Sequence, residues 1–178
     1  MPVASRMLAR IVAVAVLATC GRDAANAQSR QDTSIAHAMR SWGLLGTWAT
    51  DCSHPASLAN SYLSFHVGDR GSVLHRRDFG DGREVYEVQA ATITRDGLIE
   101  VIVDFKALGG RRRWALAKGA DGRIRAMANS KADGTDPSIR DGRFVGSNIQ
   151  ASWQTRCPDE MMSGSPFLAW RRIVLRQR

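Results

Sequence analysis

The chain has 178 residues, of which 25 are Lys or Arg and 17 are Asp or Glu, so its formal net charge at pH 7 is +8. This length suits one domain with one core and leaves little room for a second. The positive charge favours anionic partners such as lipopolysaccharide, acidic polysaccharide or membrane headgroups, or else forms a basic but inert surface.

The first 27 residues have the pattern of a secretory signal peptide. Arg6 and Arg10 form a positive start, residues 11–19 are small and apolar, and residues 25–27, Ala-Asn-Ala, suit signal peptidase. The apolar run is too short for a membrane-spanning helix, which needs about 20 residues. We therefore predict a periplasmic or secreted protein, with a single domain over 28–178 and no transmembrane segment after cleavage. Export also argues against nucleic acid as a partner.

Three cysteines support this division of the chain. Cys20 lies inside the signal, and cleavage leaves Cys52 and Cys157, 105 residues apart, as the only pair in the mature chain. In an oxidising compartment we expect them to form one disulfide, the alternative being two buried free thiols. Residues 17–20, Leu-Ala-Thr-Cys, also resemble a bacterial lipobox, so a protein anchored through lipid on Cys20 is the alternative to a freely diffusing one.

A short amphipathic helix is expected at the start of the mature chain. Ile35, Met39 and Trp42 are spaced by four and three residues, which places them on one face of a helix and predicts that they contact the core. One of the three polar residues before Ile35 could cap this helix, and Gly43 would end it.

After the helix, short runs that are rich in β-branched or aromatic residues, or that alternate between apolar and polar residues, indicate strands. Turn pairs, many of them Asp-Gly, separate the runs at intervals of about 11 to 15 residues, which is typical of neighbouring antiparallel strands. We predict an all-β fold of about eight strands, an antiparallel up-and-down barrel of lipocalin-like plan, with a two-sheet sandwich as the alternative. The predicted strands are 62–67, 71–78, 83–94, 98–106, 111–118 and 123–129.

Alternation also predicts which side chains point into the core. Successive side chains of a strand face opposite sides, and every second residue from Ile99 to Phe105 is apolar, so this face should be buried. The alanines of 123–129 leave room for the N-terminal helix or for a modest cavity. The other residues expected to point inward are Tyr86, Val88, Trp114, Leu116, Ile124, Ala126 and Ala128.

Residues 46–48, Gly-Thr-Trp, stand where the first strand is expected to begin. They are similar to the Gly-x-Trp opening of lipocalin-type barrels, in which the Trp closes one end of the barrel near a basic side chain from the last strand. The resemblance implies structural roles for Gly46 and Trp48, with Arg171 or Arg172 as the basic partner.

A longer segment resembles small exported proteins of α-proteobacteria. In those proteins Gly-x-Trp-x-x-Asp-Cys-Ser opens the barrel, and a Trp stands a few residues before the last Cys. This chain has Gly-Thr-Trp-Ala-Thr-Asp-Cys-Ser at 46–53 and Trp-Gln-Thr-Arg-Cys at 153–157. The resemblance implies a secreted β protein with a bridge between Cys52 and Cys157. It implies no particular activity, and residues 158–178 fall outside it.

Arg111, Arg112 and Arg113 precede Trp114 directly after a Gly-Gly turn. Arginine binds phosphate and carboxylate groups through paired N–H donors and stacks on aromatic rings. With the turn at the mouth of a barrel, three guanidinium groups would lie beside an aromatic ring, so these four residues are the candidate ligand site. The apolar and basic run 167–178 is expected to be the closing strand, with a membrane-surface segment as the alternative.

Signals for catalysis or metal binding are weak. The four histidines lack the spacing of metal ligands, although His66 and His75 could meet across one hairpin, and no Gly-x-Ser-x-Gly motif is present. We predict neither a metal nor a cofactor, and a monomeric, non-enzymatic β-barrel that binds an anionic lipid or polysaccharide of the envelope. The alternatives are a periplasmic protease inhibitor or interaction module and an enzyme of unrecognised type. An open apolar cavity near Trp114 and Ala126 would favour the ligand binder, and a filled barrel the inhibitor.

Overall fold

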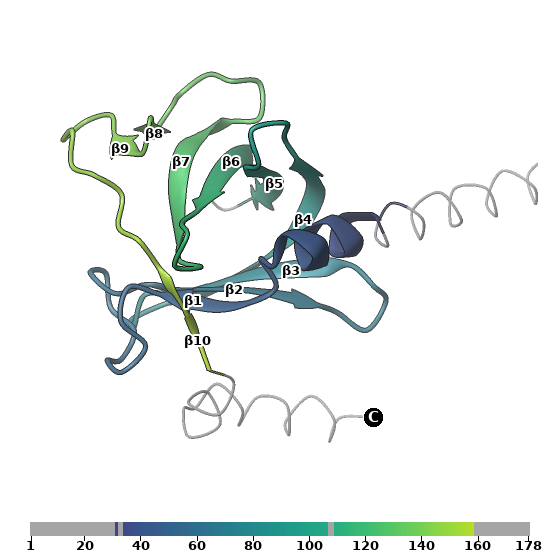
Figure 1. The fold of residues 1–178 in the computed structure, drawn as a ribbon, viewed down its shortest axis with the longest axis horizontal. Coiled ribbons are helices and arrows are strands. Elements are labelled where there is room, and N and C mark those ends of the chain that lie inside the picture. Colours follow the sequence, from purple (N-terminus) through teal and green to yellow (C-terminus); the bar gives the residue numbers. More distant parts are fainter. Residues whose placement is uncertain (1–30, 32–33, 107–108, 159–178) are drawn as a thin grey trace, which may run out of the picture.

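The computed structural model describes residues 31, 34–106 and 109–158 (Figure 1). The predicted signal peptide, Cys20 and the run 167–178 lie outside these residues. The described part of the chain forms one short helix followed by ten strands, which pair antiparallel throughout. The predicted all-β class with a short N-terminal helix is therefore confirmed.

All six predicted runs are strands, and each run agrees with the observed bounds to within two residues. A seventh strand begins at Gly46, as expected, and three further short strands lie between residues 139 and 157, where no strand is predicted. The strands are β1 (Gly46–Ala49), β2 (Tyr62–Val67), β3 (Val73–Asp78), β4 (Arg83–Ile93), β5 (Ile99–Phe105), β6 (Gly110–Lys118), β7 (Ile124–Lys131), β8 (Ile139–Arg140), β9 (Arg143–Phe144) and β10 (Thr155–Cys157).

Strands β1 to β9 each pair with their neighbours in sequence, and β10 returns to pair with β1. The sheet is not closed, because within the described residues β9 and β10, the two ends of the strand order, do not pair with each other. One isolated bridge joins Ile124, at the start of β7, to Gln154, just before β10, through backbone hydrogen bonds of 2.9 and 2.8 Å. Among the described residues, β1 pairs with β2 on one side and with Thr155–Cys157 on the other.

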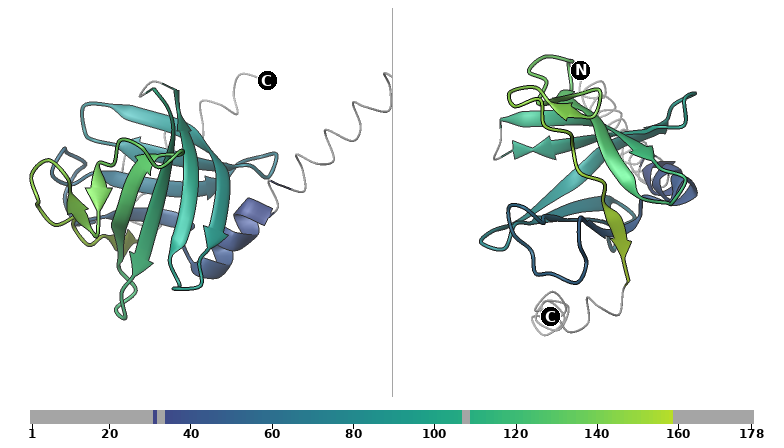
Figure 2. Two further views of the ribbon diagram at one scale, coloured as in Figure 1. Left: turned by 90° about the horizontal axis from the view of Figure 1, so that it is seen from above. Right: turned by 60° about the vertical axis from the view of Figure 1, so that its left-hand side comes forward.

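The sheet bends so that β1–β3 and β5–β7 form two facing layers (Figures 1 and 2). The bend occurs in β4, which pairs with β3 through its first residues and with β5 through its last. Its register shifts between Val88 and Ala90. Such a bulge adds one residue to one strand, which bends the strand and increases its twist. A single long strand can therefore belong to both layers.

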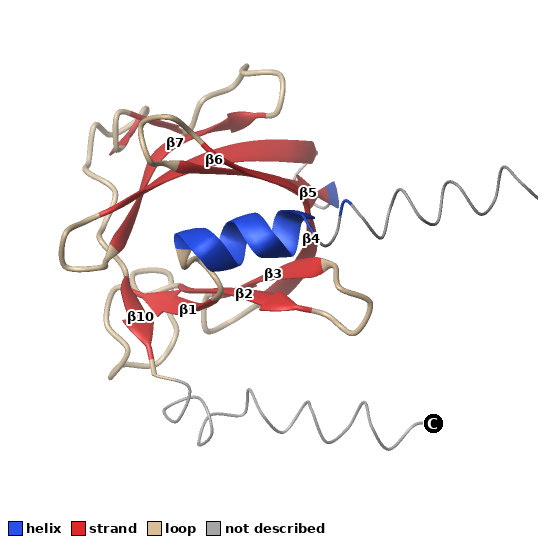
Figure 3. Ribbon diagram, turned by 45° about the vertical axis from the view of Figure 1, so that its right-hand side comes forward, coloured by secondary structure: helices blue, strands red, loops and turns tan. Residues whose placement is uncertain are grey.

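The helix, residues 34–42, lies between the two layers at one side of the interior (Figure 3). Ile35, Met39 and Trp42 are all at most 7 % exposed, as their spacing predicts. The Trp42 indole N–H donates to a backbone carbonyl in the β4–β5 turn at 2.8 Å. The helix ends as expected before Gly43, whose φ of +85° is a conformation that residues with a Cβ adopt rarely.

The predicted inward faces are correct except at the end of β7. Each of the four alternate apolar residues from Ile99 to Phe105 has an exposed fraction of 0 %. On β7 the pairing with β6 shifts after Ala115, so that Asn129, and not Ala128, lies opposite the inward-facing Trp114. Asn129 is accordingly buried, with 8 % of its surface exposed. A bulge inverts the alternation beyond it, which a simple two-residue period does not predict.

Cys52 and Cys157 form a disulfide, as predicted. The bridge joins the loop between β1 and β2 to the last residue of β10. It therefore adds a covalent link beside the pairing of Thr47 with Cys157. The β1–β2 loop and β10 are held together both by this bond and by the sheet.

Gly46 and Trp48, for which structural roles are predicted, both lie in β1. Trp48 is 2 % exposed, and its indole N–H donates to the Leu44 carbonyl at 2.8 Å. Arg156 of β10 is the cross-strand partner of Trp48, and its Nε would lie 2.9 Å from a Cβ at Gly46. A basic side chain from the last described strand thus lies against the Gly-x-Trp segment, whereas residues 171 and 172 lie outside the described chain.

Candidate functional site

A buried histidine stands at the centre of a group of aromatic rings inside the fold. His75 of β3 is 0 % exposed, and its ring stacks on Phe65 of β2 with 4.5 Å between the ring centres. Trp114 of β6 meets the imidazole edge-on, with 5.1 Å between the ring centres. Phe105 of β5 and Tyr86 of β4 complete the group, with their ring centres 4.5 Å apart. Five consecutive strands thus contribute one ring each.

The imidazole of His75 is neutral at physiological pH. Burial, assisted by the positive charge of nearby Arg77, lowers the pKa of His75 from 6.5 to about 3. The Ser64 backbone raises the pKa of His75 and so opposes this shift. It makes no hydrogen bond of regular geometry with the imidazole, and both ring nitrogens are without such a partner among the described residues. A neutral imidazole has one donor and one acceptor, and neither makes a hydrogen bond of regular geometry with a described residue.

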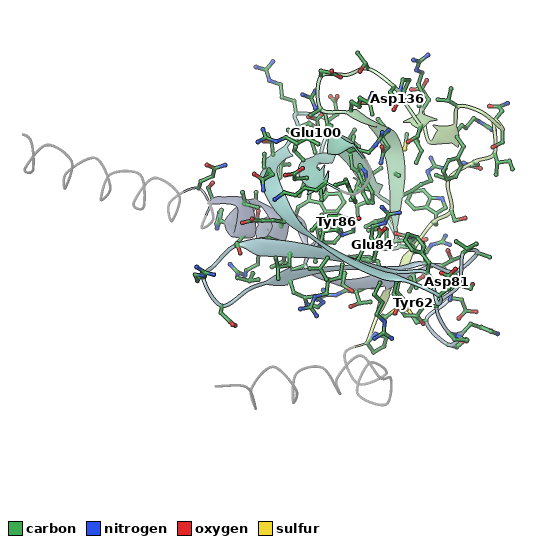
Figure 4. All side chains as sticks on the ribbon, turned by 180° about the vertical axis from the view of Figure 1, so that it is seen from behind. Tyr62, Asp81, Glu84, Tyr86, Glu100 and Asp136 are labelled. Carbon is green, nitrogen blue, oxygen red and sulfur yellow. A yellow bond between two sulfur atoms is a disulfide. The ribbon has the colours of Figure 1, made fainter. Side chains whose placement is uncertain are left out.

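Arg77, two residues further along β3, lies at the edge of this group of rings. Its side chain is 20 % exposed, and its Cζ lies 4.6 Å from the ring centre of Phe79 and 5.3 Å from that of Phe105. Its Nη1 is 3.4 Å from Oε2 of Glu84, longer than the roughly 2.8 Å of a strong charge-assisted hydrogen bond. Glu84 and Tyr86 lie on β4 between the two layers (Figure 4). The ion pair therefore leaves much of the guanidinium available.

Two further donors in this group are buried without an acceptor. They are Nε of Arg77 and Nε1 of Trp114, and neither atom can act as an acceptor itself. A buried donor without a partner destabilises a protein by about 1–3 kcal/mol, so a bound acceptor would offset this cost. A cation, two donors and several aromatic rings together suit a molecule with an anionic group and an apolar body. We call this set, with His75, Phe105 and Tyr86, the interior site.

The four residues of the predicted ligand site lie on two faces of β6. Arg112 and Trp114 point toward the interior, whereas Arg111 and Arg113 are exposed on the outer face. Strand geometry causes this division, because successive side chains alternate between the faces. The structure does not bring the three guanidinium groups together around one ring.

Arg112 is occupied by partners within the protein. Its Nε donates to Oδ1 of Asn129 at 2.6 Å, and its Nη2 donates to the Asp136 carbonyl at 3.0 Å and to Oγ of Ser138 at 3.3 Å. Its Nη1 also lies 3.4 Å from a carboxylate oxygen of Asp136, which stands at the edge of the molecule (Figure 4). Arg112 therefore holds the loop between β7 and β8 in place, and few of its guanidinium N–H groups remain to bind a ligand.

The loop between β1 and β2 contains a cavity of about 380 Å³. Asn60 organises this loop, since its Nδ2 donates to the carbonyls of Asp51, His54 and Pro55 at 2.8 to 3.3 Å. Its Oδ1 accepts from the Asp51 N–H at 2.9 Å. The Tyr62 hydroxyl lies within 2.7 Å of the His54 carbonyl. These hydrogen bonds, together with the disulfide, connect the walls of the cavity to one another.

A cluster of Asp51, Ser53 and His54 borders this cavity. The Asp51 carboxylate accepts from Oγ of Ser53 at 2.6 Å, from its N–H at 2.8 Å and from Nδ1 of His54 at 2.8 Å. These hydrogen bonds, that of the Ser53 side chain first, lower the pKa of Asp51. The Ser53 hydroxyl lies 3.1 Å from Nδ1 of His54, on the same side of the ring as the carboxylate. In a Ser-His-Asp triad the hydroxyl must face the other ring nitrogen, so this cluster is a self-contained turn.

His66 and His75 do not meet across the β2–β3 hairpin. The register pairs His66 with Leu74 and His75 with Phe65, so the two imidazoles lie on opposite faces of the sheet. Across the described residues no group of three or more His, Cys, Asp or Glu is placed to hold a metal ion. A two-histidine site across this hairpin is therefore excluded by the strand register.

Sequence reasoning missed His75 and Arg77 as interior residues, although the signal was present. Both alternate with Val73 along a predicted strand, and Val73 is fully buried.

Among the described residues no helix is long and apolar enough to cross a membrane. The chain matches no protein family, no curated protein and no solved structure.

Proposed function

We propose that this is an exported, non-enzymatic β-barrel protein that binds an amphiphilic anion in the interior site. The anionic group pairs with Arg77, and the apolar body lies against the rings of Phe105 and Trp114. The observation that carries this proposal is the group of buried donors without acceptors beside these rings. The ligand class is a carboxylate or phosphate with a hydrocarbon portion, as in a fatty acid or a lipid fragment.

The proposed barrel is supported by the bridge between Ile124 and Gln154. This bridge places β7 beside the segment that continues into β10, and β10 in turn pairs with β1. In the proposed barrel, β1 to β7 and β10 surround the aromatic core as eight strands, with β8 and β9 outside the ring. The proposed barrel also agrees with the buried Trp48 beside Arg156, the arrangement that a lipocalin-like opening implies.

Arg77 is a better anchor for an anion than any of the arginines on β6. Its guanidinium is partly buried, stacks on two rings and makes one long ion pair. An anion in such a site is shielded from water, which strengthens its attraction to the guanidinium. Arg113, in contrast, is exposed on the outer face and donates to the Ala132 carbonyl at 3.0 Å. Water and salt would screen an anion bound there.

Export of the protein is supported by the signal-like residues 1–27 and by the disulfide, since disulfides persist mainly in oxidising compartments. Amphiphilic anions are components of the bacterial envelope, which such a protein would meet. We propose a periplasmic or secreted location on this basis.

The experiment is a titration of the purified protein with dodecyl phosphate below its micelle concentration, followed by tryptophan fluorescence and calorimetry. Dodecyltrimethylammonium has the same chain with the opposite charge and serves as the ligand control. We expect tight binding of the anion only, and a loss of at least about tenfold in affinity in Arg77→Gln, since truncating one partner of a buried charged contact costs more than 1.4 kcal/mol.

Arg113→Gln is the matched protein control, because it removes one positive charge from the outer face and leaves the interior unchanged. This variant should bind dodecyl phosphate as the wild type does. Equal binding of the two amphiphiles, or an unchanged affinity in Arg77→Gln, would refute the interior site. A loss in Arg113→Gln but not in Arg77→Gln would move the site to the outer face of β6.

A further inference from the structure

A row of apolar side chains at the edge of the sheet becomes progressively exposed. Ile139 of β8 pairs with Phe144 of β9, and the Phe144 N–H donates to the Ile149 carbonyl at 2.9 Å, so the three residues lie side by side. Their exposed fractions increase from 9 % to 43 % and 65 %. Val145, in the turn between Phe144 and Ile149, is 52 % exposed. We call residues 139–149 the β8–β9 edge.

The same edge carries positive charge without a counterion. Arg140 and Arg143 are exposed and stand directly opposite each other in the β8–β9 pair. Like charges in this position destabilise a strand pair, and neither arginine makes an ion pair with any described residue. Arg125 of β7 lies behind them, since its Cζ would be 3.4 Å from a Cβ at Gly142. Asp141 is the one acidic residue of the edge.

We propose that the β8–β9 edge docks on an anionic membrane surface. Phe144, Val145 and Ile149 enter the boundary between headgroups and acyl chains, while the long side chains of Arg140 and Arg143 reach the lipid phosphates. Aromatic and aliphatic side chains flanked by arginine are the composition that binds this boundary. An anionic surface also neutralises the charge of the paired arginines, which a neutral apolar partner would not do.

The position of the edge permits this contact. Strands β8 and β9 lie at the periphery of the molecule, on the side away from the helix (Figure 1 and the left-hand view of Figure 2). A planar surface can therefore approach the edge without contacting the helix. This membrane contact is separate from the interior site and does not require that a ligand be bound there.

The test is co-sedimentation of the mature protein with phosphatidylcholine vesicles that contain either no anionic lipid or about one third phosphatidylglycerol. We expect binding to the anionic vesicles only. Phe144→Ser combined with Ile149→Ser should weaken binding by about tenfold or more, given about 25 cal/mol per Å² of apolar surface. Arg140→Gln should weaken it about fivefold, the effect of one cation near an anionic surface.

Two matched controls lie on β4 and in the β4–β5 turn, near the helix. Ile93 is 43 % exposed, as Phe144 is, and Arg95 is exposed as Arg140 is. Ile93→Ser and Arg95→Gln should bind anionic vesicles as the wild type does, and urea unfolding of every variant checks that the fold is intact.

Several results would overturn the proposal. Failure of the wild type to bind anionic vesicles would do so, as would equal binding to both kinds of vesicle. Equal losses in the edge variants and the control variants would show that binding depends on total charge and hydrophobicity rather than on this edge. Concentration-dependent dimers that disappear in the Phe144 and Ile149 variant, without vesicle binding, would identify the edge as a contact between two copies of the chain. Loss of dodecyl phosphate binding by Arg77→Gln, with vesicle binding unchanged, would support the independence of the two sites.

Discussion

Protonation of His75 should make the folded state less stable in mild acid. Its pKa is 6.5 in an unfolded chain and about 3 in the folded protein, so the unfolded state binds the proton more tightly. The contribution of the neutral ring to stability is complete above pH 6.5 and is lost as the pH falls from 6.5 toward 3. At about pH 5 this one residue should reduce the free energy of unfolding by about 2 kcal/mol relative to neutral pH. Because pH 5 is well above the folded pKa, the value depends almost only on the unfolded pKa.

The assay is urea unfolding of the wild type and of His75→Phe at about pH 7.5 and about pH 5. Phenylalanine keeps a ring against Phe65 and Trp114 but cannot be protonated. We expect the wild type to lose about 2 kcal/mol more than His75→Phe between the two pH values, while other titrating groups affect both proteins equally. If the wild type and His75→Phe have the same pH dependence, His75 is not buried in its neutral form.

Two further predictions concern the loop between β1 and β2. Reduction of the bridge between Cys52 and Cys157 should lower the free energy of unfolding by up to about 4.7 kcal/mol, since it closes a loop of about 100 residues; urea midpoints that are equal with and without reductant would contradict this. Gly80→Ala should destabilise the protein more than Gly97→Ala. Both glycines have positive φ, which costs about 1–2 kcal/mol with a Cβ, but only at Gly80 would the Cβ lie 2.4 Å from a backbone oxygen, that of Ala56. Equal losses in urea unfolding would show that the loop moves aside.

The long elements could be predicted from the sequence because each repeats its pattern several times. The helix spacing of Ile35, Met39 and Trp42 and the alternation from Ile99 to Phe105 each report several buried positions. Strands β8 and β9 contain two residues each, which is too short for any period to appear. The alternation wrongly predicts that Ala128 points inward. The register shift between Ala115 and Leu116 of β6 moves Ala128 to the outer face of β7 and Asn129 to the inner face.

The candidate site was harder to predict than the fold. A run of three arginines in the sequence suggests one cluster, but in a strand it divides between two faces, as Arg112 and Arg113 show. In contrast, the interior site gathers its five residues from four strands, β3 to β6, and no short segment contains them. His75 and Arg77 are polar, so composition does not place them in the interior. Their position on the buried face of β3 follows only because they lie two and four residues after Val73, and every second residue of a strand points to the same face.

The two ends of strands β4 to β7 have different physical roles, and this division explains how a small fold can retain buried polar groups. At one end the helix supplies apolar contacts, and Lys118 of β6 donates to the Trp42 carbonyl and lies over its ring. At the other end stand Glu84, Arg112 and the aromatic rings of the interior site. Because the disulfide and the helix stabilise the fold elsewhere, the donors of Arg77 and Trp114 can remain unpaired. A ligand that supplies an acceptor would therefore stabilise the protein by removing a cost already present in the folded state.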